Sequence, residues 1–128
     1  MKINGINRLK LIQLRDEINM IIDMTEEFRD LSEASDQEVV QTLYIEKGNI
    51  NEIIEALNAS GYKISSSRGM RNYTSGDVSK ILLGNKDSPV GMIAKAFYDY
   101  NKAKSGWIAL IRVCQAMKEM DNELCRSN

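Results

Sequence analysis

Histidine is absent from this 128-residue sequence, which removes the commonest general base and metal ligand. Only two cysteines are present, Cys114 and Cys125, too few for a disulfide framework or, without histidine, for a standard structural zinc site. The sequence also lacks a phosphate-binding loop and a dinucleotide fingerprint. We therefore expect a protein that is not an enzyme and that uses no cofactor, metal or small-molecule substrate.

Long apolar runs are also missing, since none approaches the roughly 18 to 20 residues that cross a bilayer. The first ten residues, MKINGINRLK, contain neither the apolar core nor the small-residue cleavage site of a signal peptide. We expect a cytoplasmic protein with no membrane partner.

Turn-forming residues are scarce, with one proline and eight glycines, while 43% of the residues are hydrophobic. A β-sandwich needs many more turn residues, so this composition favours helices. The sequence predicts one domain over residues 1–128. Its fold class is all-α, with five to six helices, a helix-turn-helix or winged-helix-like unit, and a short β wing.

Helix start signals recur along the chain in the form of a Ser, Thr or Asn followed three residues later by an acid. Such pairs predict helices that begin directly after the first residue of each pair. The pairs are Ser35 with Glu38, Asn49 with Glu52, and Thr74 with Asp77.

These signals divide the chain into three regions. Residues 6–31 form the longest helical candidate, whose apolar face is either core-facing or a dimer seam. Residues 36–84 form the helix-turn-helix-like unit. Residues 88–125 form a C-terminal helical pair, whose first helix starts at Ser88 and Pro89 and whose second is expected to be capped by Ser105.

Charge is unevenly distributed although the whole chain carries only −1. Residues 1–60 hold 6 basic and 12 acidic side chains, whereas residues 61–104 hold 8 basic and 3 acidic ones. A local patch governs the choice of partner more than the total does, because charges are screened over about 8 Å.

The stretch GYKISSSRGMRNYTSGDV, residues 61–78, has no acid before Asp77. Basic side chains, small polar donors and a helix amino terminus together suit a polyanion, which a carboxylate here would repel. The alternative interpretation is a solvated connector. The predicted nucleic-acid-binding residues are Lys63, Ser66, Arg68, Arg71, Asn72, Ser75, Gly76, Ser79 and Lys80.

The longer segment NINEIIEALNASGYKISSSRGMRNYTSGDVSKILLG, residues 49–84, resembles the DNA-binding part of the recombinase region of large serine recombinases. In that family a helix ending in a Leu-Asn, glycine-containing turn precedes a short wing, an aromatic residue and a helix ending in Val-x-x-Ile-Leu. The loop here is longer and richer in serine, and no catalytic serine domain accompanies it. The resemblance therefore implies DNA contact without strand cleavage.

We expect a non-catalytic DNA-binding protein, either a transcriptional regulator or an accessory factor of a plasmid or phage, a mobile-element role that rests on the resemblance. A homodimer is expected because one small module with few phosphate contacts binds weakly, and two modules raise affinity through effective concentration. RNA stays open as a partner in place of DNA. The alternative is an acidic helical protein-interaction module, such as an adaptor, an antitoxin-like protein or an inhibitor.

Overall fold

The computed structural model describes residues 5–29, 31–32, 34–84 and 88–126, of which residue 29 and residues 120–126 are described by their backbone alone. Over these residues the chain forms six α-helices and one two-stranded antiparallel hairpin, which confirms a mostly helical fold with a short wing. In chain order the elements are α1 (Arg8–Glu26), a 3₁₀ turn (Glu27–Arg29), α2 (Asp36–Lys47), α3 (Ile50–Ala59), β1 (Ile64–Ser66), β2 (Gly69–Arg71), α4 (Ser75–Gly84), α5 (Pro89–Ala103) and α6 (Trp107–Arg126).

Four of the five predicted helix start residues, Ser35, Asn49, Thr74 and Ser88, cap the helix that follows them. The Ser35 side chain accepts a hydrogen bond from the backbone N–H of Glu38 and thereby caps α2. Asn49 caps α3 in the same way, through the N–H of Glu52 at 3.2 Å. Ser88 caps α5, with proline in the first turn. Each cap satisfies a backbone donor that the helix itself cannot pair.

Two helix boundaries differ from prediction. The first α-helix ends at Glu26 rather than near residue 31. Two successive acids, Glu26 and Glu27, lie at its carboxyl end, where negative charge interacts unfavourably with the helix dipole. The last helix begins at Trp107, and the carbonyl of Gly106 accepts its first hydrogen bond from Leu110 N at 3.0 Å. The expected Ser105 cap is therefore wrong, because Gly106, with φ of 97°, holds the cap position.

The buried apolar residues form two clusters. The first joins α2, α3, α4 and α5 and comprises Val39, Val40, Tyr44, Ile53, Leu57, Tyr73, Val78, Leu82 and Ala94. The second joins α1, α5 and α6 and comprises Ile21, Met24, Ile93, Leu110, Ile111, Cys114 and Met117.

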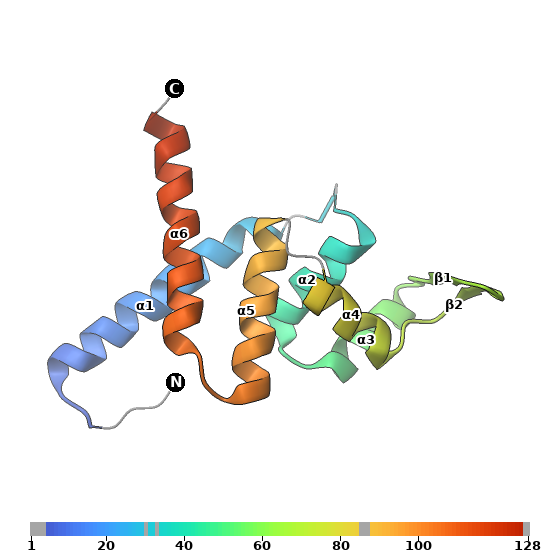
Figure 1. Ribbon diagram of the computed structural model, residues 1–128, viewed down its shortest axis with the longest axis horizontal. Helices are drawn as coiled ribbons and strands as arrows, with labels where there is room; N and C mark the ends of the chain where they lie inside the picture. The colour runs from blue at the N-terminus through green and yellow to red at the C-terminus, as the bar shows by residue number, and fades with distance from the viewer. Residues whose placement is uncertain (1–4, 30, 33, 85–87, 127–128) are drawn as a thin grey trace.

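Helix α5 links the two clusters because its Ala94 belongs to the first cluster and its Ile93 to the second. Figure 1 shows α5 near the centre, with α1 and α6 on one side and α2, α3 and α4 on the other. The β1–β2 hairpin projects beyond α3 and α4 at the end of the molecule away from α1 (Figure 1). Among the described helices, none is both long enough and apolar enough to cross a membrane.

Candidate nucleic-acid interface

The hairpin turn is closed by its own side chains. Ser66 Oγ donates a hydrogen bond to the carbonyl of Gly69 at 2.7 Å and accepts one from Arg68 N at 3.3 Å. Gly69 has a φ of 105°, a region that residues with a Cβ rarely adopt. The predicted contact residue Ser66 is therefore part of the turn itself, while Arg68 lies within the turn with its side chain exposed.

The register of the hairpin divides its side chains between two faces. Ile64 lies opposite Arg71, and Ser65 lies opposite Met70. Side chains of directly opposed residues point to the same face, and successive residues alternate. Ile64 is half-buried against the first cluster, so Arg71 shares the face turned toward the helices, whereas the Ser65 and Met70 pair faces away.

The same register brings Lys63 opposite Asn72, just beyond the paired strands. The ammonium of Lys63 donates a hydrogen bond to the side-chain oxygen of Asn72. By the alternation, both residues belong to the outward face that carries Ser65 and Met70. Two of the predicted contact residues therefore lie together on the solvent side of the wing.

Arg71 makes a bidentate ion pair with Asp77 of α4. Its Nη1 donates to Asp77 Oδ2 at 2.6 Å and its Nη2 to Oδ1 at 2.8 Å. The Arg71 guanidinium, together with hydrogen bonds from the N–H and hydroxyl of Thr74, holds the pKa of the Asp77 carboxyl well below its usual range. The pair ties the last residue of β2 to the first turn of α4 and so fixes the base of the wing.

This pairing changes the interpretation of Arg71. Sequence reasoning placed Arg71 among free cations for a phosphate, whereas here its charge is offset by Asp77. The sequence feature that could have indicated this pairing is the Thr74–Asp77 capping box, which places a carboxylate in the first turn of α4. What the sequence did not give was the hairpin register that turns Arg71 toward that carboxylate.

Helix α4 presents a small polar face to solvent. Val78 and Leu82 are fully buried, which leaves Ser75, Gly76 and Lys80 exposed. Ser79 is half-buried. This arrangement follows from the helical period, because residues three and four apart share a face.

Tyr73 joins the wing to the first cluster. It is 5% exposed, and burial raises the pKa of its hydroxyl. Tyr73 therefore anchors the loop in the core, and its ring is too buried to stack on a base. With Arg71 paired to Asp77 and Tyr73 buried in the first cluster, the hairpin is attached to the helices at two adjacent residues.

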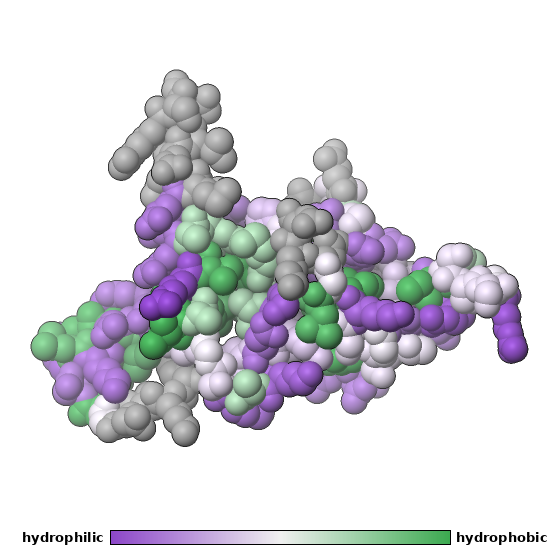
Figure 2. Space-filling view, in the orientation of Figure 1, coloured by the Kyte–Doolittle hydropathy of each residue, from purple (hydrophilic) through white to green (hydrophobic). Residues whose placement is uncertain are grey.

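Two of the predicted cations have no side-chain partner of any kind among the described residues. The side chains of Arg68 and Lys80 are exposed, and neither makes an ion pair or a side-chain hydrogen bond within that part of the chain. The hairpin projects at the right of Figure 1, and Figure 2 shows a strongly hydrophilic end to this projection.

The wing also exposes an apolar side chain that sequence reasoning did not select. Met70 is 66% exposed and shares the outward face with Ser65. The alternation of strand residues could have indicated it, but the bounds of so short a hairpin are not visible in the sequence.

Helix α3, in contrast to α4, exposes the acids Glu52 and Glu55. Because these carboxylates would repel an anion, α4 is the better suited of the two helices to contact one.

Comparison with protein-family models, with curated proteins and with solved structures finds no significant match. The likeness of residues 49–84 to the serine recombinase segment therefore stays a prediction.

Proposed function

We propose that the chain is a non-catalytic DNA-binding protein that contacts duplex DNA through the β1–β2 wing and the exposed face of α4. The observation that carries the proposal is the pair of exposed cations Arg68 and Lys80, which lie on two elements held together by the Arg71–Asp77 ion pair. Phosphate contacts of this kind give most of the affinity of small DNA-binding modules.

The wing and α4 have different roles in this proposal. Arg68 in the turn, with Lys63 and Asn72 on the outward face, contacts the phosphate backbone. The small side chains of Ser75 and Gly76 let the amino end of α4 approach a groove edge closely. Arg71 acts as a positioning residue, because its charge is already offset by Asp77.

The biological role that we propose is a transcriptional regulator or an accessory factor of a plasmid or phage. The resemblance of residues 49–84 to the serine recombinase segment supports the second role. Neither role requires catalysis, and both require a duplex-binding face that stays accessible while the rest of the fold provides stability.

The test is a salt titration of binding to a random-sequence duplex, followed by fluorescence anisotropy. Affinity should fall steeply between about 50 and 200 mM salt as counterions are released. The double variant Arg68→Ala with Lys80→Ala should reduce the slope of log K against log salt by about 2, which corresponds to two lost phosphate contacts. The matched control replaces Arg112 and Lys118, two exposed cations of α6, and should leave the slope unchanged.

Two results would contradict the proposal. One is no binding by the unaltered protein at 50 mM salt or below, and the other is an equal loss in the double variant and in its control. The alternative function, an acidic protein-interaction module, predicts instead that a basic protein is captured and that the Arg68 and Lys80 substitutions leave this capture intact.

A further inference from the structure

Helix α1 carries an apolar stripe that the other described residues leave uncovered. Ile21 and Met24 are buried against the second cluster, but Leu11, Ile18 and Ile22 are 47%, 36% and 50% exposed. These three residues lie within about 40° of one another around the helix, at 100° per residue. Figure 2 shows apolar side chains at the left end of the molecule, where Figure 1 places the amino-terminal half of α1.

A groove runs alongside this stripe. Lys10, Leu14, Ile18 and Ile22, four residues apart, line two hollows of about 420 and 270 Å³ in succession. The opposite wall of both hollows includes Tyr100 and Trp107.

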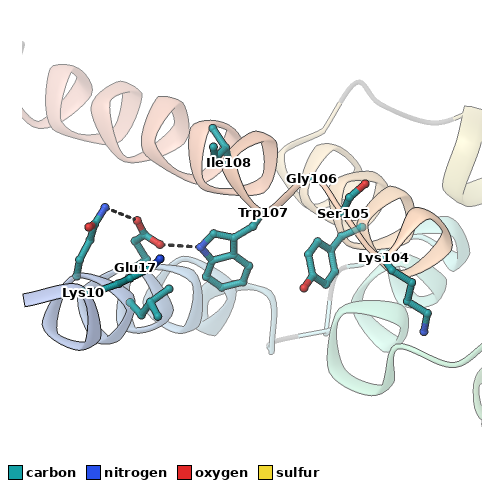
Figure 3. Close-up of a pocket in the computed structure, with 10 residues that line it drawn as sticks. Lys10, Glu17, Lys104, Ser105, Gly106, Trp107 and Ile108 are labelled. Carbon is teal, nitrogen blue, oxygen red and sulfur yellow. Dashed lines mark hydrogen bonds between the residues drawn. The ribbon is translucent and has the colours of Figure 1, made fainter. Parts of the chain in front are cut away.

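The far wall is held in place by contacts with α1. The indole of Trp107 donates a hydrogen bond to Glu17 Oε2 at 2.6 Å, as Figure 3 shows, and its ring packs edge-on against Tyr100 at 6.1 Å. The far wall of the groove is therefore tied to α1, and the lining of the second hollow is apolar and aromatic apart from Asn101.

The charges of α1 are segregated along its length. Residues 8–15 contain three basic side chains and no acid, whereas residues 16–27 contain five acids and no base. A second copy of the same helix laid in parallel would oppose like charges. The same helix laid antiparallel would oppose the basic half of one copy with the acidic half of the other.

We propose that this face of α1 is where a second copy of the chain docks, with the two α1 helices antiparallel across a two-fold axis. Such an interface is self-complementary, because each copy contributes the same stripe and the same two charged halves. The uncovered apolar residues Leu11, Ile18 and Ile22 then lose their contact with water.

The positions of the charges set the register. Arg8 and Glu26 are 18 residues apart, which is five full turns, so they lie on the same flank of the stripe. Antiparallel pairing that places Arg8 beside Glu26 of the partner subunit also places Leu11 beside Ile22 of the partner subunit, within one residue. Charge pairing and apolar pairing therefore agree on one register.

This dimer is compatible with the proposed DNA contact and independent of it. Figure 1 places α1 at the end of the molecule away from the hairpin, so pairing through α1 leaves both wings accessible. The experiments below contain no nucleic acid, and their failure would leave the DNA proposal untouched.

The first experiment measures mass by sedimentation equilibrium from about 1 to 100 µM, a range that brackets micromolar affinity. The chain of 14.5 kDa should approach twice that mass as concentration rises. Ile22→Asp should weaken association by on the order of 100-fold, because it places a charge in the apolar seam. The matched control Met70→Asp, which also alters an exposed apolar residue, should associate like the unaltered protein.

The helical circular dichroism of each variant is recorded, so that loss of folding is separated from loss of association. If Ile22→Asp unfolds, the concentration dependence of the mass of the unaltered protein still tests the proposal. A mass of 14.5 kDa at every concentration would overturn the proposal. Equal weakening by Ile22→Asp and Met70→Asp in folded proteins would overturn it as well.

The second experiment tests the antiparallel orientation by disulfide formation in a Cys125→Ser background. Leu11→Cys mixed with Ile22→Cys should form the crossed disulfide between the two variants faster than either variant cross-links with itself. Self-cross-linking of each variant without the crossed product would indicate a parallel pair and would overturn the proposed geometry.

Discussion

The α2–α4 unit and helix α1 are both built from amphipathic helices, yet of the two only the unit contains apolar residues with no exposed surface. Ile53, Val78 and Leu82 of the unit have no exposed surface. In α1 the best-buried apolar residues keep some exposure, and Ile22, next to buried Ile21, is half exposed. A helix pattern therefore predicts which face is apolar, but the number of neighbouring elements decides how much of that face is covered.

This difference separates the surfaces that the two regions offer. Because the unit shares a well-covered core with α5, its wing turn and the outer face of α4 present exposed cations, Arg68 and Lys80. Because α1 packs mainly against α6, it leaves an apolar stripe between charged halves. The first surface suits a polyanion and the second a protein partner.

The largest expected effect comes from opening the core of the unit. Leu82→Ala should lower the free energy of unfolding by about 2 to 5 kcal/mol, the usual range for a fully buried leucine. The adjacent Leu83, 44% exposed, is the matched control, and Leu83→Ala should cost less than about 1 kcal/mol. Urea denaturation measures both, and similar costs would contradict the full burial of Leu82 in the core of the unit.

The second prediction concerns how well α1 and α6 seal the second cluster. Burial raises the pKa of the Cys114 thiol to about 11, so its thiolate is scarce near neutral pH. In a Cys125→Ser background, Cys114 should react with a thiol reagent at pH 8 roughly 100-fold or more slower than a free cysteine. Denaturation should remove the protection. Fast labelling of the native protein would show that the contact between α1 and α6 opens readily.

Helix beginnings could be predicted because a cap is a local interaction. Ser35, Asn49 and Thr74 each act on a residue three positions away, so the signal lies within one turn of sequence. The Arg71–Asp77 pair joins residues only six positions apart, but it depends on which way the hairpin turns its side chains. Sequence spacing does not contain that register.

The third prediction tests how the wing is attached to α4. Asp77→Ala should lower the free energy of unfolding by about 1 kcal/mol at pH 7, the size of a lost helix cap. Asp99→Ala is the control, because Asp99 pairs with Lys95 on an exposed helix surface, and it should cost less than about 0.5 kcal/mol.

The pH dependence of this effect has a definite sign. Since Arg71 lowers the folded pKa of Asp77, its stabilisation is fully present above the unfolded pKa of about 4 and is lost as pH falls through the lower folded pKa. The difference between the unaltered protein and Asp77→Ala should therefore be constant from pH 6 to 8 and shrink below about pH 4. A difference that grows on acidification would be inconsistent with the Arg71–Asp77 pair.

The smallest expected effect lies on the stripe of α1. At concentrations where the chain is monomeric, Ile22→Ala should change the free energy of unfolding by less than about 1 kcal/mol, because the side chain is already half exposed. Its buried neighbour gives the contrast, since Ile21→Ala should cost about 2 kcal/mol or more. Thermal denaturation at low protein concentration measures the loss of stability in both variants, Ile22→Ala and Ile21→Ala. Equal costs would mean that the stripe is covered within one chain.

The exposure of the α1 stripe could not be predicted from the sequence, which left the core-facing and dimer-seam interpretations open. Leu14, Ile18 and Ile21 follow a helical period whichever partner covers them. The position of α6 decides the outcome, because α6 covers the face with Ile21 and Met24 and leaves Ile18 and Ile22 uncovered. That position depends on long-range packing.

The most direct test of the proposed DNA interface is a titration of ¹⁵N-labelled protein with a short duplex at low salt, followed by amide chemical shifts. The largest shifts should fall within residues 63–72 of the wing and residues 75–80 of α4, while the amides of α6 stay nearly unchanged. Shifts concentrated on α5 and α6, shifts spread over the acidic residues 1–60, or no shifts at all would contradict DNA binding through the wing and α4.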